Sequence, residues 1–397
     1  MRVENLSKVF GRRGRQALDR RRSGATKAEA EDATGATIGV FDANFEVHRN
    51  EIFVVIGLSG SGKSTLLRLL NHLIEPTDGD VYIDDEHVSR LSRKQLRQLR
   101  RRKIGMVFQH FGLLPNRTVM DNITYGLEVQ GVPAEERDQA GAETLKLVGL
   151  EGQADRRITQ LSGGMQQRVG LARALATKQE ILLMDEPFSA LDPLIRQDMQ
   201  ELFLTIQGEI QRTVVFITHD LDEALRLGHR VAVMNAGEIV QIGTPEDILA
   251  NPADEYVERF IAHADYAKVR SAERVMATPD EVVFVDDEPA AVLGRMRSAG
   301  LASTCVLDRE RRLVGLVEID GLGKLTDRGG TDIAKAVTPM RDVSPDTPLR
   351  DIIPFFVASG TPVAVTDKGR HLKGVIAREA LMSGLCKGEA AEEGVLT

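Results

Sequence analysis

The sequence predicts an α/β fold with a buried parallel sheet, followed by a smaller α+β module made of two similar copies. Short apolar runs alternate with helical segments from Ile38 to about Asn251, which is typical of a sheet covered by helices. One of these runs leads directly into a glycine-rich segment that begins at Gly57. Near the end of the chain, residues 313–322 align with residues 372–381, which indicates an internal repeat.

The length and composition are those of a globular protein with more than one domain. The chain has 397 residues, of which 42% are hydrophobic and 28% are charged. No apolar run approaches the ~18 residues that a membrane span requires, and no apolar signal core opens the chain. We therefore expect a cytosolic protein in which Cys305 and Cys386 are free thiols. The net charge of −8 disfavours non-specific nucleic-acid binding.

An opening strand is expected from Val3 to Phe10, and a polar insertion follows it up to Thr37. Few acidic residues accompany the basic residues of the insertion, which are Arg12, Arg13, Arg15, Arg20, Arg21, Arg22 and Lys27. It is either a solvated segment or a basic arm that contacts a partner or anionic lipid headgroups.

Compact apolar runs are consistent with buried parallel strands at Ile52–Ile56, Ile181–Met184, Val214–Thr218 and Arg230–Met234. The stretch 118–150 is expected to be helical instead. Pro133 and the glutamates after it are typical of a helix start, and Gly149 is typical of a helix end. Because this stretch interrupts the strand pattern, we predict a helical subdomain over about residues 112–170.

The character of the chain changes after about residue 267. Two copies of a β-α-β-β-α unit are expected, since one copy alone would bury little apolar area. Pro289 and Pro348 precede the aligned segments at matching positions, and so do Asp308 and Asp367. The predicted domains are residues 1–265, 266–328 and 329–386, and the acidic tail 387–397 is expected to be disordered.

The glycine-rich segment matches the phosphate-binding P-loop pattern, in which Gly57 and Gly62 are separated by four residues and Lys63-Ser64 follow. The glycines let successive backbone N–H groups face the phosphates, and the helix N-terminus adds positive potential. Lys63 is expected to reach the β- and γ-phosphates, and the Ser64 hydroxyl to ligate Mg²⁺. The rest of the predicted cradle is Ser59, Gly60, Ser61 and Thr65.

Polar side chains end three other apolar runs. Asp185 is placed to hold Mg²⁺, and Glu186 to polarise an attacking water. His219 follows a later run, where an imidazole can hydrogen-bond the γ-phosphate. Gln109 ends the run Ile104–Phe108 and is placed to contact Mg²⁺ or the γ-phosphate. We therefore predict Glu186, His219, Gln109 and Lys63 as catalytic residues, and Ser64, Gln109 and Asp185 as metal ligands.

A second glycine-rich motif, Leu161-Ser-Gly-Gly-Met-Gln-Gln, opens another helix. Ser162, Gly163, Gly164 and Gln166 lie at this helix start, which again suits an anion. One chain thus has two phosphate-binding helix starts for a single triphosphate. We expect the second to serve the nucleotide of another subunit.

Taken together, and in their order along the chain, the motifs described above resemble those of the ATP-binding subunits of ABC transporters. The resemblance covers roughly residues 1–265 and extends to the segment Ser189-Ala-Leu-Asp192. It implies ATP and Mg²⁺ as cofactors and a head-to-tail homodimer that holds two ATP molecules between its subunits. It also implies that Glu186 is the catalytic base, that Asp192 faces the other subunit, and that Phe10 stacks on adenine.

Several segments resemble the glycine betaine/proline betaine importers of bacteria. They are Leu73-Ile-Glu-Pro-Thr77, Phe188 to Ile195, His219 to Ala224 and the polar insertion. The resemblance implies ATP-driven uptake of a quaternary-amine osmoprotectant. It also implies a location on the cytoplasmic face of the plasma membrane, with a permease and an extracytoplasmic solute-binding protein as partners. Gln109 and the segment Phe111–Val119 would couple to the permease.

The C-terminal repeat resembles a tandem CBS module, which that group of importers also carries. Nucleotide-binding CBS repeats commonly place a Ser/Thr and an Asp after the glycines that correspond to Gly315 and Gly374. Those positions hold Glu318, Gly321, Ala377 and Ala380, so a ribose would lack its carboxylate partner. Sensing of ionic strength, another ligand, and dimerisation alone remain open for this module.

Three classes of function stay in competition at this point. The first is an importer ATPase, for which choline, carnitine, proline or another amino acid are alternative solutes. The second is a soluble ABC-type ATPase that acts on DNA or ribosomes; the single nucleotide domain and the negative charge disfavour it. The third is a non-catalytic, nucleotide-gated regulatory protein, which the combination of Glu186, His219 and Lys63 disfavours.

Overall fold

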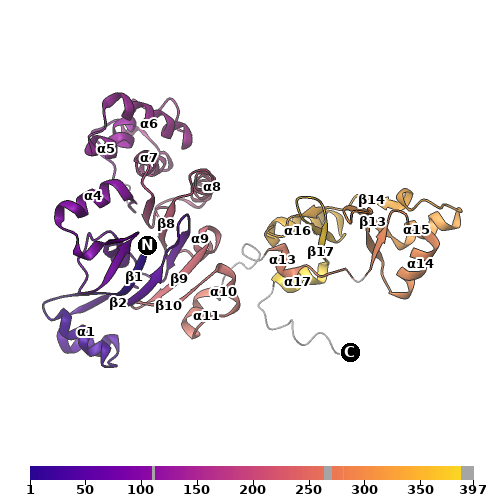
Figure 1. Cartoon of the computed structure of the whole chain (residues 1–397), viewed down its shortest axis with the longest axis horizontal. Helices are drawn as coiled ribbons and strands as arrows, with labels where there is room; N and C mark the ends of the chain where they lie inside the picture. Colours follow the sequence, from indigo (N-terminus) through magenta and orange to yellow (C-terminus); the bar gives the residue numbers. More distant parts are fainter. Residues whose placement is uncertain (110–111, 263–270, 280, 386–397) are drawn as a thin grey trace. The chain divides into compact units, whose positions relative to one another are not determined.

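The computed structural model describes residues 1–109, 112–262, 271–279 and 281–385 (Figure 1). The chain divides into two units, Met1–Ala264 and Asp265–Thr397, and each is described on its own. The predicted disordered tail 387–397 and Cys386 lie outside the described residues.

A six-stranded sheet with the order β10-β9-β3-β8-β7-β6 forms the centre of the first unit. Its strands are β3 (Ile52–Ile56), β6 (Ile104–Val107), β7 (Ile181–Asp185), β8 (Thr213–Thr218), β9 (Arg230–Asn235) and β10 (Glu238–Gly243). Strands β9, β3, β8, β7 and β6 run parallel, and β10 pairs antiparallel with β9 at one edge. Every residue of β3, β7 and β8 is buried, as continuous apolar runs require, so the prediction of buried parallel strands is confirmed.

A four-stranded antiparallel sheet with the order β2-β1-β4-β5 packs beside the central sheet. Its strands are β1 (Arg2–Phe10), β2 (Thr37–Glu46), β4 (Asp78–Ile83) and β5 (Glu86–His87). Helix α3 (Lys63–Leu70) contributes fully buried leucines to the apolar core that joins the two sheets. This burial fixes α3, and with it the loop that begins the helix.

After α3, the α-helices of the first unit are α4 (Arg93–Lys103), α5 (Val119–Gln130), α6 (Ala134–Leu147), α7 (Gly163–Ala176), α8 (Pro193–Ile210), α9 (Leu221–Leu227), α10 (Pro245–Ala250) and α11 (Glu255–Ile261). Figure 1 shows α5, α6 and α7 grouped above the sheets. Helices α5, α6 and α7 pack together. The stretch expected to be helical thus forms α5 and α6, and Gly149 adopts the left-handed conformation (φ 66°) just after α6.

The polar insertion after β1 is folded rather than fully solvated. It forms α1 (Gly14–Arg22) and α2 (Lys27–Thr34). Their few apolar side chains share a small core with strands β1 and β2: Val9, Ala17, Leu18, Ala30, Ala36 and Ile38. The insertion is therefore a helical pair attached to the edge of the antiparallel sheet.

The second unit contains the predicted repeat. After α13 (Ala272–Val275), the first copy comprises β11 (Val282–Phe284), α14 (Pro289–Ser298), β12 (Ser303–Leu307), β13 (Leu313–Glu318) and α15 (Ile319–Asp327). The second comprises β15 (Asp342–Val343), α16 (Leu349–Ser359), β16 (Val363–Thr366), β17 (Leu372–Ile376) and α17 (Arg378–Leu385), and β14 (Val337–Thr338) joins the sheet of the first.

Matching turns confirm the internal symmetry. Asp308 Oδ1 accepts hydrogen bonds from the backbone N–H groups two and four residues later, and Asp367 Oδ1 does the same. Each turn then passes through a left-handed arginine, Arg311 (φ 63°) or Arg370 (φ 62°). Each copy has its own apolar core, and a further cluster contains residues from both copies.

Candidate functional site

Two glycines of the loop between β3 and α3, Gly57 and Gly62, cannot be replaced by another residue without displacing backbone. A Cβ on Gly57 would lie 2.1 Å from the carbonyl oxygen of Met234, and one on Gly62 would lie 2.1 Å from that of Gly39. Gly62 also has a φ of 104°, which favours glycine. The loop thus passes tightly between β9 and β2. The N–H of Ser61 donates to the carbonyl oxygen of Leu58 (3.2 Å), which closes a turn inside the loop.

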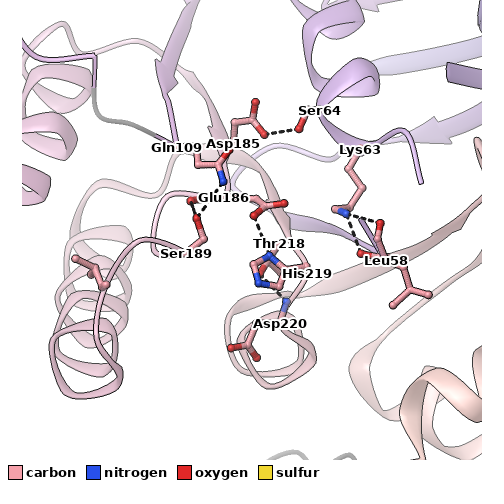
Figure 2. A network of polar contacts seen from close by, with 12 residues as sticks. Leu58, Lys63, Ser64, Gln109, Asp185, Glu186, Ser189, Thr218, His219 and Asp220 are labelled. Carbon is pink, nitrogen blue, oxygen red and sulfur yellow. Dashed lines mark hydrogen bonds and ion pairs between the residues drawn. The ribbon is translucent and has the colours of Figure 1, made fainter. Parts of the chain in front are cut away.

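Lys63 is held at the first position of α3. Its ammonium donates to the carbonyl oxygens of Gly57 (2.8 Å) and Leu58 (3.0 Å) (Figure 2). The residue is only 5% exposed. Burial lowers the pKa of its ammonium, and the negative charges of Glu186 and Asp185 oppose this shift. An ammonium has three donors, so one remains for a phosphate oxygen.

Two of the three side chains predicted as metal ligands, Ser64 at the start of α3 and Asp185 at the end of β7, are in contact. Ser64 Oγ donates to Asp185 Oδ1 over 2.8 Å, although the residues are far apart in sequence (Figure 2). Asp185 is buried and lies 3.7 Å from the guanidinium of Arg68. Two oxygens at this spacing form a hard donor set that fits Mg²⁺.

The described residues contain no group of three or more His, Cys, Asp or Glu side chains that could hold a metal by itself. In nucleotide enzymes, one or two protein oxygens commonly hold magnesium together with substrate phosphates and water. Ser64 and Asp185 would therefore hold Mg²⁺ together with a bound nucleotide.

Glu186 and His219 form a hydrogen-bonded pair at the ends of β7 and β8. His219 Nδ1 lies 2.8 Å from Glu186 Oε2 (Figure 2). The histidine side chain is 53% exposed and that of the glutamate is 17% exposed. Glu186 itself adopts a left-handed backbone conformation (φ 45°), which is rare for a residue with a side chain. Its position is held by a hydrogen bond from its N–H to the carbonyl of Ile217 (3.0 Å).

Gln109 is connected to this pair through a residue to which sequence reasoning gave no role. Its Nε2 lies 3.5 Å from the Oγ of Ser189, and that hydroxyl donates to the carbonyl oxygen of Glu186 (3.0 Å). Gln109 follows β6, Glu186 follows β7 and His219 follows β8, so three neighbouring strands each deliver at least one polar group to the site (Figure 2). Only the presence of Ser189 in a motif next to the carboxylates could have suggested its part.

These groups border one cavity of about 590 Å³, a size typical of small-molecule sites. The predicted residues that line it are Phe10, Ser59, Gly60, Gly62, Lys63, Ser64, Thr65, Gln109, Glu186 and His219. Gly57, Ser61 and Asp185 do not line it, and Asp185 is connected to it through its hydrogen bond with Ser64. Phe10 is 40% exposed, and its ring would meet a Cβ on Gly39 at 2.9 Å.

The cavity has further wall residues that sequence reasoning missed: Lys27, Thr37, Ile38 and Gly39. Thr37 pairs with Phe10 across strands β1 and β2, so the register of these strands carries it to the cavity. Lys27 comes from helix α2 of the insertion. Nothing in the sequence distinguishes Lys27 from the other basic residues of the insertion, so its place at the cavity could not be predicted.

The second glycine-rich motif does not border this cavity. Ser162 is the N-cap of α7, where its side chain accepts from the N–H of Met165, and Gly163 and Gly164 begin the helix. Gln166 turns its amide to the carbonyls of Ile158 and Leu161. Asp192 is likewise exposed and is the N-cap of α8. The structure thus separates these residues from Lys63 of the same chain.

Helix α7 is nevertheless tied to the carboxylates of its own chain. Gln167 is 1% exposed and donates its side-chain amide to the carbonyl oxygen of Pro187, the residue after Glu186. At the other end of α7, the buried guanidinium of Arg212 donates to the carbonyls of Ala174 and Leu175. Both ends of α7 are therefore hydrogen-bonded to the segments that adjoin strands β7 and β8.

Among the residues that the structure describes, no helix is long and apolar enough to cross a membrane.

Comparison with known proteins gives consistent relatives over nearly the whole chain. Residues 40–189 match the ABC transporter family. The chain is 50% identical to the glycine betaine/carnitine transport ATP-binding protein GbuA of Listeria monocytogenes, and the alignment covers 98% of each chain. It is 48% identical to the glycine betaine transport ATP-binding protein OpuAA of Bacillus subtilis (97% of this chain, 92% of the relative). It is 44% identical to the glycine betaine/proline betaine protein ProV of Escherichia coli (96% of each).

Solved structures agree with these relatives. The dimeric structure of the ATP-binding cassette MJ0796 in a post-hydrolysis state, bound to ADP and Pi, is 33% identical, with a TM-score of 0.52. The alignment covers 62% of this chain and 98% of that one. The match over nearly the full length of the relatives, together with the assembled P-loop and strand-end residues, shows that the chain belongs to the family of ABC transporter ATP-binding proteins, and that it is an ATPase of the kind found in glycine betaine transport systems.

Proposed function

We propose that this protein hydrolyses ATP to energise the import of a quaternary-amine osmoprotectant, such as glycine betaine, through a membrane permease. One observation carries the choice of solute: relatives named for glycine betaine transport match both units of the chain, with 98% of each chain covered for GbuA. A relative named for choline transport is less similar, at 36% identity, so choline is a second candidate. An extracytoplasmic binding protein would deliver the solute.

The hydrolysis step follows from the pair Glu186 and His219. Glu186 would accept a proton from the attacking water, because its carboxylate lies at the cavity wall beside the phosphate loop. His219 Nδ1 lies 2.8 Å from this carboxylate, and the other ring nitrogen would hydrogen-bond the γ-phosphate. Gln109, linked to Glu186 through Ser189, would position the water or the metal.

The charge of the triphosphate would be met by three groups. Lys63 would turn one N–H to the β- and γ-phosphates, and the backbone N–H groups of residues 57–65 would surround them. Ser64 and Asp185 would hold Mg²⁺, which neutralises the charge that develops on the phosphate oxygens. Phe10 would stack on the adenine from the other end of the cavity.

Two copies would form a head-to-tail dimer. The exposed start of α7, with Ser162, Gly163 and Gly164, lies away from the cavity of its own chain, which supports a role at the nucleotide of a second copy. Gln166 would support this helix start from within, and Asp192 would lie at the dimer contact. Gln109 and residues 112–119 would pass the motion to the permease. Residues 110–111 of the predicted coupling segment lie outside the described residues.

The second unit would be a tandem CBS module with a regulatory or dimerising role. Two β-α-β-β-α copies with matching aspartate turns support this proposal. Its predicted halves, 266–328 and 329–386, would each hold one copy. Deletion of residues 271–397 tests the role, because unchanged activation by salt would exclude sensing by this unit.

The transport function is tested by reconstitution. The protein would be placed in liposomes with a permease and a solute-binding protein for glycine betaine, and uptake of labelled glycine betaine and release of phosphate would be followed together. We expect both to require ATP and to rise with glycine betaine. Competition with choline, carnitine and proline ranks the solutes. Phosphate release that no solute or permease changes would instead support a non-transport ATPase.

A further inference from the structure

The helical insertion after β1 uses two of its cations to attach itself to the rest of the first unit. Arg21 pairs with Glu238 on β10, and its guanidinium lies 4.6 Å from the ring centre of Phe41 on β2. Arg22 pairs with Asp78 on β4. With the small apolar core of α1 and α2, these pairs fix the insertion against both sheets.

One cation of the insertion has a different environment. Lys27, the first residue of α2, is half-buried and lines the cavity that also contains the phosphate loop and Glu186. Within the described part of the chain, Lys27 has no ion-pair or hydrogen-bond partner for its ammonium. The exposed arginines of α1, such as Arg15 and Arg20, do not line this cavity.

The backbone around Lys27 is held firmly. The Thr26 side chain accepts from the N–H of Glu29 (3.3 Å), and Glu29 Oε2 accepts from the N–H of Thr26 (2.8 Å), which closes a capping box at the start of α2. Glu31 Oε1 accepts from the N–H of Ile38 (2.6 Å), and Ile38 also lines the cavity. The carboxylates of Glu29 and Glu31 are thus engaged with backbone donors, and α2 is tied to the cavity wall.

An unpaired ammonium on the wall of a nucleotide cavity calls for an anion. The ammonium can only donate hydrogen bonds and prefers charged oxygens, and of the parts of a nucleotide only the phosphates are anionic. We propose that Lys27 binds the polyphosphate of the nucleotide, so that the insertion completes the site in its own subunit. The proposal rests on the ATPase function and adds to it a binding residue from outside the P-loop.

Steady-state hydrolysis by the full-length protein tests this. Lys27→Met should raise the KM for ATP about two- to fivefold at low salt, the size expected of a partly exposed ion pair, and leave kcat unchanged. Lys27→Arg should keep the parental KM. The effect should vanish near 1 M salt, where the Debye length falls to about 3 Å. Arg20→Met is the matched control, and its KM should stay at the parental value.

Binding of smaller ligands separates the phosphates from the rest of the nucleotide. Lys27→Met should weaken binding of ADP and leave adenosine binding unchanged. An unchanged KM at low salt, or an equal loss for adenosine, would overturn the proposal. Either result would leave the ATPase function intact, because kcat and its dependence on Glu186 are measured in the same assay. Thermal unfolding of the Met and Arg variants checks that both fold.

Discussion

The side chain of Gln167 donates a hydrogen bond to the backbone carbonyl of Pro187, which joins the second glycine-rich helix to the residue after Glu186. If the start of α7 closes over a nucleotide held by a second copy, any shift of the helix is transmitted to Pro187, the residue after Glu186. Because the contact lies inside one chain, it would offer the proposed dimer a route by which each site responds to the other.

Replacement of Gln167 should weaken this route. Gln167→Leu leaves the Pro187 carbonyl without its donor at a buried place, which costs about 1–3 kcal/mol. We expect a lower kcat with the KM for ATP nearly unchanged, measured by phosphate release against ATP concentration. Gln139→Leu, on the exposed face of α6, is the control. A parental kcat in Gln167→Leu would show that the contact is only structural.

Glu186→Gln should abolish turnover without loss of nucleotide binding. The amide cannot accept the proton of the attacking water, so kcat should fall at least about 100-fold, as for loss of a general base. ATP binding should persist, and ATP should drive the variant into a stable dimer that gel filtration detects. The exposed Glu151→Gln is the control and should keep parental activity. Hydrolysis by Glu186→Gln at the parental rate would assign the base to another group.

A mixed pair of inactive variants tests the head-to-tail arrangement. Lys63→Ala disables the P-loop, and Ser162→Arg blocks the start of α7 with a bulky cation. In a head-to-tail mixed dimer, both lesions fall on one nucleotide and the other site is intact, so mixing should restore part of the activity. If each chain serves its own nucleotide, the mixture should stay as inactive as the separate variants.

The buried carboxyl of Glu223 predicts how stability changes with pH. Burial raises the pKa of Glu223, although hydrogen bonds from Thr218 and Gln200 oppose the shift. The native state therefore holds this proton to higher pH than the unfolded state, and the stability that the group contributes falls as pH rises through that range. Glu223→Gln should remove this slope: its unfolding temperature should match the parental value at about pH 5 and exceed it at about pH 8.

The exposed Glu135→Gln provides the comparison for this experiment. It should follow the parental curve at every pH. An unfolding temperature of Glu223→Gln that stays below the parental value at about pH 8 would mean that the hydrogen bond from Gln200 (3.0 Å) outweighs the cost of the buried charge.

The central sheet and its strand-end residues were predictable because one physical pattern determines both. Continuous apolar runs form parallel strands, and parallel strands place their ends at one edge, so Ser64 and Asp185 meet although they are far apart in sequence. Glu186 and His219 come together for the same reason. The turns at Asp308 and Asp367 could likewise be expected from the repeat.

The contribution of the insertion could not be predicted in this way. Its composition is dominated by charge, and a short helix with few apolar residues gives no clear period. Only the packed structure distinguishes Arg21 and Arg22, which pair with carboxylates of distant strands, from Lys27, which lines the cavity. The bond from Ser189 to the Glu186 carbonyl also depends on a local turn that the sequence pattern does not encode.

The left-handed backbone conformation of Glu186 (φ 45°) lowers the stability of the fold at a position whose side chain the proposed hydrolysis requires. A residue with a Cβ in this conformation loses about 1–2 kcal/mol relative to glycine. Laboratory selection for thermal stability alone should therefore favour glycine at this position and yield variants that are more stable but inactive. Any screen for robust versions of this protein needs a simultaneous demand for turnover.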